Sequence, residues 1–257
     1  MKQLLLTVVA LFVCGTLLAQ GPQPQIGIGA GGKNIIKYNL SGTALSHYAI
    51  QYERVTTPRQ SFALGLGISP NVGLPFKQTL LDQFGDNTDA RRAIESTRFT
   101  KFTITPEYRF YVGKKGAPSG FYIAPFGRYT YMDLEQVYTF TPSSGREHKP
   151  LINGTFRGVG GGVLFGSQWL LGKKQNIVLD WWIAGPFIGS MNASFNGKDD
   201  MSDMSAADKA DLENDIESVE LPLWKIDATV GNNVIDVKLT GPFYGVRAFG
   251  LSLGIRF

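Results

Sequence analysis

The chain has 257 residues, a formal net charge of +4 and a single cysteine, Cys14. One cysteine excludes an internal disulfide and any site built from several thiolates. Only 18% of the residues are charged, whereas 31 are glycine and 12% are aromatic, which is a low charge content for a secreted protein that folds in water. The basic residues are spread along the chain and not gathered beside stacked aromatics, so neither the charge nor its distribution indicates nucleic-acid binding.

The first residues predict export. Lys2 is followed by an uncharged apolar run over residues 4–18 and by Ala19, the pattern of a signal peptide that is cleaved after Ala19. The run is too short for a membrane-spanning helix. Val13 stands before Cys14 where a lipoprotein signal requires a small residue, so we expect cleavage and not acylation. The chain therefore divides into a signal peptide, 1–19, and one mature domain, 20–257.

Beyond residue 19, no uncharged apolar stretch reaches the ~18 residues that a transmembrane helix needs. The mature chain alternates instead with the period of a strand. In the clearest example, residues 102–112, Phe102 and Ile104 lie on one face, and Glu107 and Arg109 lie on the other. A strand of this length, with charges on its polar face, is typical of a segment that crosses a bilayer at a tilt.

Eight such strands are predicted, and their connections alternate in length. The strands cover residues 34–41, 46–56, 61–69, 98–112, 120–133, 155–170, about 177–187, and 243–257. Short turns follow the second, fourth and sixth strands, and external loops are expected at about 70–97, 134–154 and 190–241. An even strand number with this alternation predicts an all-β, eight-stranded antiparallel transmembrane up-and-down β-barrel. A β-sandwich is the alternative, although it does not explain the loop lengths.

The polar faces of these strands carry charges of both signs. The residues expected to point into the lumen are Lys37, Glu53, Lys101, Glu107, Arg109, Arg128, Arg157 and Asp180. Eight strands leave room only for side chains, so we expect a paired polar core. The aromatics expected in the interfacial girdles are Tyr48, Tyr129, Tyr131, Trp169, Phe243 and Phe257. Arg247 interrupts the alternation of the last strand, which predicts a bulge near it.

Several segments resemble known proteins. "LSLGIRF", residues 251–257, resembles the insertion signal of Gram-negative outer-membrane barrels, which implies that the barrel assembly machinery recognises Phe257. "NIIKYNL", "AIQYERV", "TPEYRFYVGKKGAPSGFYIAPFGRY" and "GPFYGVRAFGLSLGIRF" together resemble a family of small outer-membrane barrels known only as a domain of unknown function. The resemblance implies an eight-stranded barrel like those of OmpA and OmpX, in the Gram-negative cell outer membrane, in contact with its lipid and lipopolysaccharide. It implies no catalytic residues.

The stretch "GIGAGGKN", residues 27–34, matches the spacing of a phosphate-binding loop. Such a loop needs a strand before it, a helix after it and a hydroxyl residue after the lysine. Here Asn34 replaces the hydroxyl and a strand is predicted to follow. We therefore expect no nucleotide binding and no other cofactor.

The last loop, 190–241, is the most structured of the predicted loops. Ser205 is a typical cap for a helix that places Leu212, Ile216 and Val219 on one face. Residues 225–241 predict a hairpin with arms too short to cross a membrane, so its arms are not counted as barrel strands. The acids of the loop lack the spacing of a calcium-binding EF-hand, and we single out no metal-binding residue. A protein partner is expected to bind at 190–241.

The predicted role is that of a non-enzymatic outer-membrane protein of structural, surface-interaction or accessory-subunit type. The first alternative is an enzyme that hydrolyses or transfers lipid acyl chains, with His148 near Ser144 and Glu147 in an external loop. A narrow pore is the second alternative. His47 follows Ser46 directly, and adjacent strand residues point to opposite faces, so this pair does not form a nucleophile and base. No catalytic residue is therefore assigned.

Overall fold

The computed structural model describes residues 32–84, 88–143, 145–218 and 223–257. The strands in these ranges are β1 (Asn34–Asn39), β2 (Tyr48–Thr57), β3 (Gln60–Gly73), β4 (Arg98–Tyr111), β5 (Gly120–Val137), β6 (Leu151–Leu171), β7 (Ile177–Lys198), β8 (Lys225–Val230) and β9 (Val234–Arg256). The helices are α2 (Leu40–Thr43), α3 (Lys77–Phe84), α4 (Thr88–Ser96) and α5 (Ala206–Glu217). The predicted signal peptide, Cys14 and most of "GIGAGGKN" lie outside the described residues.

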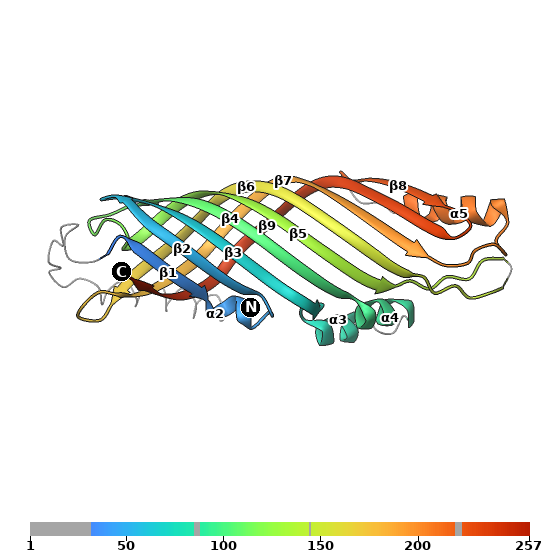
Figure 1. Cartoon of the computed structure of the whole chain (residues 1–257), viewed down its shortest axis with the longest axis horizontal. Helices are drawn as coiled ribbons and strands as arrows, with labels where there is room; N and C mark the ends of the chain where they lie inside the picture. The colour runs from blue at the N-terminus through green and yellow to red at the C-terminus, as the bar shows by residue number, and fades with distance from the viewer. Residues whose placement is uncertain (1–31, 85–87, 144, 219–222) are drawn as a thin grey trace, which may run out of the picture. The chain divides into compact units, whose positions relative to one another are not determined.

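Eight strands close into an antiparallel ring (Figure 1). The order is β1 to β7 and then β9, and β9 pairs back onto β1, with Ile36 opposite Ile255. Phe257 extends this seam, because its N–H donates to Asn34 at 2.8 Å and its carbonyl accepts from Asn34 at 3.0 Å. The predicted eight-stranded antiparallel barrel is confirmed, and the closed ring rules out the β-sandwich.

The strand faces are distributed as the alternation predicts. In β1, Ile36 and Tyr38 point outward and are exposed, whereas Lys37 and Asn39 are buried inside the ring. The same division holds in β2, where Gln51 is buried in the interior. An apolar outside around a polar inside is the arrangement of a barrel that meets lipid. Separately, no helix of the described residues is long and apolar enough to cross a bilayer.

The strands differ greatly in length. β1 has 6 residues and β2 has 10, whereas β7 has 22 and β9 has 23. About 9–11 residues suffice for a transmembrane strand, so β7 and β9 continue well beyond a bilayer's thickness. Figure 1 shows them running past the ends of β1 to β3 toward the end of the barrel that carries α5. We call this the loop end, and the opposite end, with the short turns after β2, β4 and β6, the turn end.

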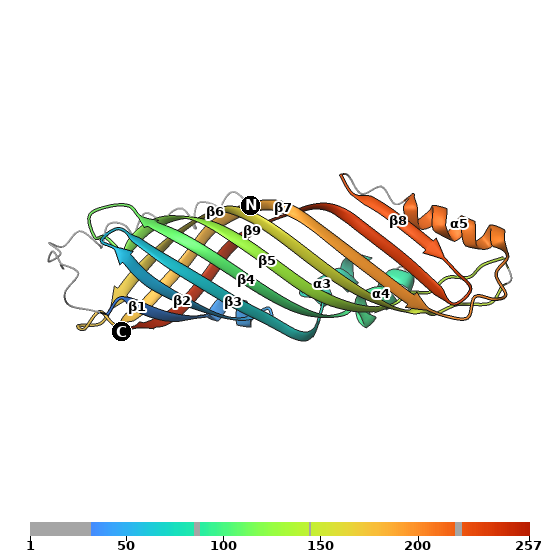
Figure 2. The same ribbon diagram turned by 45° about the horizontal axis from the view of Figure 1, so that its top comes forward.

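The structure corrects the predicted boundaries of the last loop. Residues 190–198 belong to β7, and residues 234–241, one arm of the predicted hairpin, are the first part of β9. This arm is a true barrel strand because β7 supplies hydrogen-bonding partners along its whole length, from Lys198 opposite Val234 onward. The other arm, β8, lies outside the ring and pairs with β9 over residues 235–240 (Figure 2). β8 thus covers the side of β9 that the short β1 leaves unpaired.

Phe243, which was predicted in an interfacial girdle, lies inside the barrel together with Phe187. Phe187 packs edge-on against the buried Phe126 with ring centroids 6.2 Å apart, and Phe243 lies 5.1 Å from Phe187. The in-and-out phase of β9 changes around Phe249, whose φ is 55°. In β7 the alternation between inward and outward side chains changes at the same level. The pairing with β9 keeps its register there, with Trp182 opposite Gly250 and Ala184 opposite Ala248. The irregularity predicted near Arg247 is therefore a matched phase change in β7 and β9, and the register shift falls on the other side of β7, between Phe165 and Gly166 of β6.

The glycines of β6 make room for large inward side chains. A Cβ on Gly166 would overlap the Tyr122 hydroxyl, and one on Gly158 would overlap the Phe243 ring. These glycines obscured the phase of the strand in the sequence, and the predicted inward position of Arg157 is wrong. Arg157 is exposed, and its guanidinium lies 5.8 Å from the centre of the Tyr131 ring.

Barrel closure can be tested with a cysteine pair at Ile36 and Ile255. With Cys14→Ser to remove the native thiol, Ile36→Cys with Ile255→Cys should form a disulfide on mild oxidation. Residues directly opposite in an antiparallel ladder have Cα atoms about 4.5–5.5 Å apart, within the range that a disulfide bridges. Ile36→Cys with Leu251→Cys, which is out of register, is the control and should stay reduced. Equal cross-linking of both pairs in peptide mass spectra would contradict the β1–β9 seam.

Candidate functional site

Polar residues from five strands meet inside the barrel, toward its turn end. Lys37 Nζ donates to Glu53 at 2.6 Å, to Asp180 at 2.7 Å and to the Gln168 side-chain oxygen at 2.9 Å. Arg109 Nη1 donates to Asp180 at 2.8 Å and to Gln168 at 3.1 Å. All five side chains are at most 1% exposed.

Further groups complete this network. Glu107 accepts from Arg109 Nη2 at 2.8 Å with one carboxylate oxygen and from Arg247 Nη2 at 2.8 Å with the other. The Tyr111 hydroxyl donates to Glu53 at 2.7 Å, and the Tyr122 hydroxyl donates to Asp180 at 2.8 Å. The six charged members are Lys37, Arg109 and Arg247 against Glu53, Glu107 and Asp180, so their formal charges cancel.

This plug network, defined by those six charged residues with Gln168, Tyr111 and Tyr122, occupies the lumen of a narrow barrel. Eight strands enclose a space that side chains fill, and the side chains that fill it here are buried and mutually bonded. An isolated charge in such a place is costly, whereas a paired and hydrogen-bonded charge is tolerated. The predicted paired core is confirmed for Lys37, Glu53, Glu107, Arg109 and Asp180.

Sequence reasoning missed the neutral half of this network. Tyr111 follows Arg109 by two residues on the polar face of its strand, so the alternation already predicted that Tyr111 points into the lumen. Gln168 lies in the glycine-rich strand whose phase was unreadable. Arg247 stood out only as an irregularity, because the phase change near Phe249 turns it inward.

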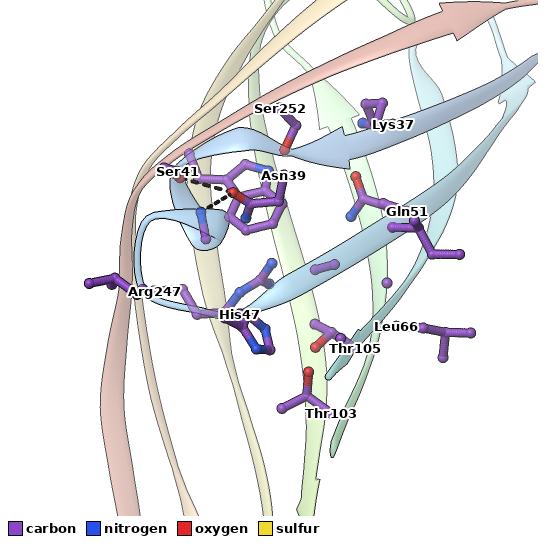
Figure 3. Close-up of a pocket in the computed structure, with 18 of the residues that line it drawn as sticks. Lys37, Asn39, Ser41, His47, Gln51, Leu66, Thr103, Thr105, Arg247 and Ser252 are labelled. Carbon is purple, nitrogen blue, oxygen red and sulfur yellow. Dashed lines mark hydrogen bonds between the residues drawn. The ribbon is translucent and has the colours of Figure 1, made fainter. Parts of the chain in front are cut away.

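A cavity of about 430 Å³ lies on the loop-end side of the plug network (Figure 3). Its inward-facing lining comes from five strands and from the connection that precedes β2: His47, Gln51, Thr103, Thr105, Arg128, Trp182, Arg247 and Ser252. In Figure 3 the side chains of Gln51, Thr103 and Thr105 point toward this space, whereas Leu66 points away from it. We call it the lumen pocket.

Arg128 in the lumen pocket and Lys101 beside it differ from Arg247, which is paired with Glu107. Neither Arg128 nor Lys101 forms an ion pair within the described part of the chain, so the predicted pairing of these two residues is wrong. Arg128 lies instead 5.9 Å from the centre of the Phe187 ring. Lys101 shares the inward face of β4 with Thr103, one step nearer the loop end. The His47 ring, hydrogen-bonded through Nδ1 to Ser69 Oγ at 3.0 Å, also lines the pocket.

Two buried donors of the lumen pocket are also unmatched. Nη1 of Arg247 and Nε2 of Gln51 find no hydrogen-bond partner among residues 32–84, 88–143, 145–218 and 223–257. A buried donor without an acceptor costs about 1–3 kcal/mol, and more when it is charged. Two polar side chains of this pocket, that of Gln51 and that of Arg247 from the plug network, are thus incompletely satisfied.

His148 is buried in the extended wall at the loop end. Its ring stacks on Phe140 with centroids 5.1 Å apart, Nδ1 lies 3.0 Å from Asp199 Oδ2, and Nε2 lies 3.4 Å from Asp203 Oδ1. Glu147, by contrast, is solvent-exposed and pairs with Lys149 at 2.7 Å. Ser144 lies outside the described residues, and no hydroxyl in the described ranges is hydrogen-bonded to the His148 ring.

The helix of the last loop packs on its own hairpin. Leu212 and Ile216 of α5 contact a small core formed by Met201, Met204, Val230 and Ile235. The predicted apolar stripe of the helix is therefore covered by the protein itself, and Val219 lies outside the described residues. Ser205 caps α5 by accepting from Asp208 N at 3.1 Å.

Acids of α5 protect the outer edge of β8. Glu213 accepts from Val230 N at 2.6 Å, and Glu217 accepts from Ala228 N at 2.9 Å. An uncovered strand edge is a site for aggregation, and these two carboxylates occupy it. Within the described ranges, no group of three or more His, Cys, Asp or Glu side chains is arranged to hold a metal ion.

Removal of the central cation should destabilise the barrel. Arg109→Met leaves buried carboxylates of Glu53, Glu107 and Asp180 short of a partner, so we expect the free energy of unfolding to fall by about 3–5 kcal/mol. Urea unfolding of the refolded protein in lipid vesicles measures this. Arg59→Met, in the exposed turn after β2, is the matched control. Equal stability of the two variants would contradict a structural role for the plug network.

The contact between α5 and the neighbouring loop should depend on pH. Hydrogen bonds from Ser143, at 2.5 Å, and from Ser205 lower the pKa of Asp208 from 3.8 to about 2. The folded-state pKa is the lower one, so the ionised carboxylate stabilises this contact above pH 3.8, and the stabilisation is lost as the pH falls through 2. Carboxyl ¹³C NMR should show Asp208 titrating near pH 2.

Ser143→Ala should raise the pKa of Asp208 toward its ordinary value, because the hydroxyl that stabilises the carboxylate is gone. Ser202→Ala is the control, since Ser202 bonds Asp200 instead. An unchanged Asp208 titration in Ser143→Ala would contradict the contact.

Comparisons with known proteins add a family assignment. No curated protein matches the chain. The N-terminal β-barrel domain of Pseudomonas aeruginosa OprF aligns with 88% of this chain and 99% of its own at 10% identity, with a TM-score of 0.26. A major outer membrane protein of Thermus thermophilus aligns with 82% of this chain and 98% of its own at 11% identity, with a TM-score of 0.34.

Those TM-scores are too low to carry an argument, so the barrel rests on the strand pairing described above. The family model is different, because it matches residues 36–210, more than half of the chain, from β1 into α5. The chain belongs to the family described as Protein of unknown function (DUF3575).

Proposed function

We propose that this protein is a non-enzymatic barrel of the Gram-negative outer membrane, with a closed lumen and a surface-interaction or accessory-subunit role at its loop end. The plug network is the observation that carries the proposal. Six paired charges from β1, β2, β4, β7 and β9 are buried across the lumen, with their formal charges balanced. A lumen built in this way supports anchoring more than passage of solutes.

The outer face supports the membrane assignment. Exposed apolar side chains such as Ile50, Leu66 and Leu253 encircle the ring, opposite the polar interior. A soluble monomer rarely exposes a continuous apolar surface of this extent, whereas a lipid-facing barrel requires it. Export through a cleaved signal peptide, contact with lipopolysaccharide and recognition of Phe257 by the barrel assembly machinery belong to this proposal.

The loop end supports the interaction role. β6, β7 and β9 extend beyond the length needed to cross a bilayer. α5 begins with a capping box of its own and packs on β8 and β9 through a small core. A tethered flexible loop needs no such construction. Since the apolar stripe of α5 is covered, a partner at 190–241 would meet a polar surface that includes the exposed acids Asp211 and Asp215.

The enzyme alternative receives less support from the geometry. The pair of His148 and Asp199 resembles a base with its orienting carboxylate, yet His148 is 1% exposed and stacked beneath Phe140. Substrate lipid would have to displace that ring to reach either nitrogen. We therefore propose a structural role for His148, which ties the 140–148 segment to Asp199 and Asp203.

A closed lumen predicts no ion conduction. The affinity-purified protein, refolded and inserted into planar lipid bilayers, should give no stable conductance steps, because buried ion pairs block the path at the turn end. Insertion is verified by protease protection of the same preparation. Reproducible steps of uniform size from inserted protein would contradict the proposal and favour the narrow pore.

A further inference from the structure

We propose that the lumen pocket is a binding site for a small oxyanion with two negative charges, of the phosphate class, that enters from the loop end. This inference goes beyond the proposed function, which needs no ligand. It rests on the balance of charge inside the barrel, on the unmatched donors of the pocket, and on the size and opening of the cavity.

The charge balance inside the barrel leaves two cations over. The plug network is neutral by itself, with three acidic and three basic side chains. Arg128 and Lys101 point inward above it without a carboxylate partner in the described part of the chain. Glu107, the carboxylate whose charge acts on Arg128, is already bound by Arg109 and Arg247. A dianion in the pocket would bring this part of the lumen to neutrality.

The unmatched donors face the same space. Arg247 lines the pocket and keeps Nη2 on Glu107, whereas its buried Nη1 has no acceptor within the described ranges. Nε2 of Gln51, which lines the pocket from β2, is in the same condition. Two buried N–H donors from β9 and β2, together with the Arg128 guanidinium from β5, are what an oxyanion with several acceptor oxygens requires.

Hydroxyl groups and an aromatic wall complete the pocket. Thr103 and Thr105 project into it from β4, and Trp182 lines it from β7. Its volume of about 430 Å³ falls in the range typical of small-molecule sites, roughly 300–1,000 Å³. A phosphate group with a small organic substituent fits this volume, with the substituent against Trp182.

The opening of the pocket follows from the shortness of β1 and β2. α2 begins at Leu40, directly after β1. At the end of the connection to β2, the His47 ring packs against Gly67, and a Cβ on Gly67 would overlap this ring. The polar plug lies on the other side of the cavity. A ligand therefore approaches past α2 and His47, from the loop end.

Proton NMR of the two mature-chain histidines gives a direct test, since His47 borders the pocket and His148 lies in the remote extended wall. Inorganic phosphate titrated into the refolded protein at constant ionic strength should shift the His47 imidazole signals along a saturating curve. The His148 signals should stay in place, which controls for general salt effects. Unchanged His47 signals throughout the millimolar range, with phosphate and with the lipid probe below, would overturn the proposal.

A matched pair of variants assigns the binding to the pocket. Arg128→Gln should weaken phosphate binding by about tenfold or more, the usual effect of losing a hydrogen bond to a charged group. Arg157→Gln, on the outer face of the neighbouring strand, removes the same charge and should leave the binding curve unchanged. Should Arg128→Gln not refold, Lys101→Gln takes its place with an expected weakening in the same direction. Equal affinity of the pocket variant and Arg157→Gln would overturn the proposal.

The source of the phosphate group is settled by a second probe. Dihexanoyl phosphatidic acid, a short lipid with the same headgroup chemistry, is titrated in parallel. Saturation by inorganic phosphate supports a free anion as ligand, whereas saturation by the short lipid alone supports a lipid headgroup. Sulfate that displaces either probe would support an oxyanion site of broad selectivity, and binding of neither probe would overturn the site.

Discussion

The whole barrel depends on the neutralisation of charges that are buried away from water in the plugged part of its lumen. Lys37 and Arg109 share Asp180 and Gln168, and their remaining donors reach Glu53 and Glu107. These contacts come from five strands, and they form only if each strand keeps its pairing register and turns the same face toward the lumen. Unmatched or shifted strands would leave a buried charge alone, at a cost of several kcal/mol.

The same constraint explains where glycine is placed. Gly166 lies under the Tyr122 hydroxyl that bonds Asp180, and Gly250 lies under the Trp182 ring that borders the lumen pocket. A barrel of eight strands accepts large inward groups only where the facing wall is small. At the loop end the strands differ in length, and β9 continues beyond β1. β8 pairs with this part of β9, and carboxylates of α5 accept hydrogen bonds from the outer edge of β8.

Much of this fold was predictable, because alternation in strands such as β2 and β4 separates lipid-facing from lumen-facing residues without ambiguity. The charged core followed from the same signal. The failures share a physical cause. Glycine has no preference for either face of a strand, so the glycine-rich sequence of β6 did not show that Arg157 points outward. In β7 and β9 the alternation changes at the same level, and this change turns Phe187 and Phe243 inward. The lumen pocket could not be foreseen, since the lack of partners for Arg128 is a property of three-dimensional neighbours.

The central claim is that apolar residues of the ring face lipid around a polar, closed interior. Nitroxide labels at Ile104 and Phe110, two outward positions on β4, test it most directly by electron paramagnetic resonance in lipid vesicles. The account predicts that collisions with apolar oxygen exceed those with a polar nickel chelate at both positions. A greater exposure to the nickel chelate at both would place this face in water and contradict the account.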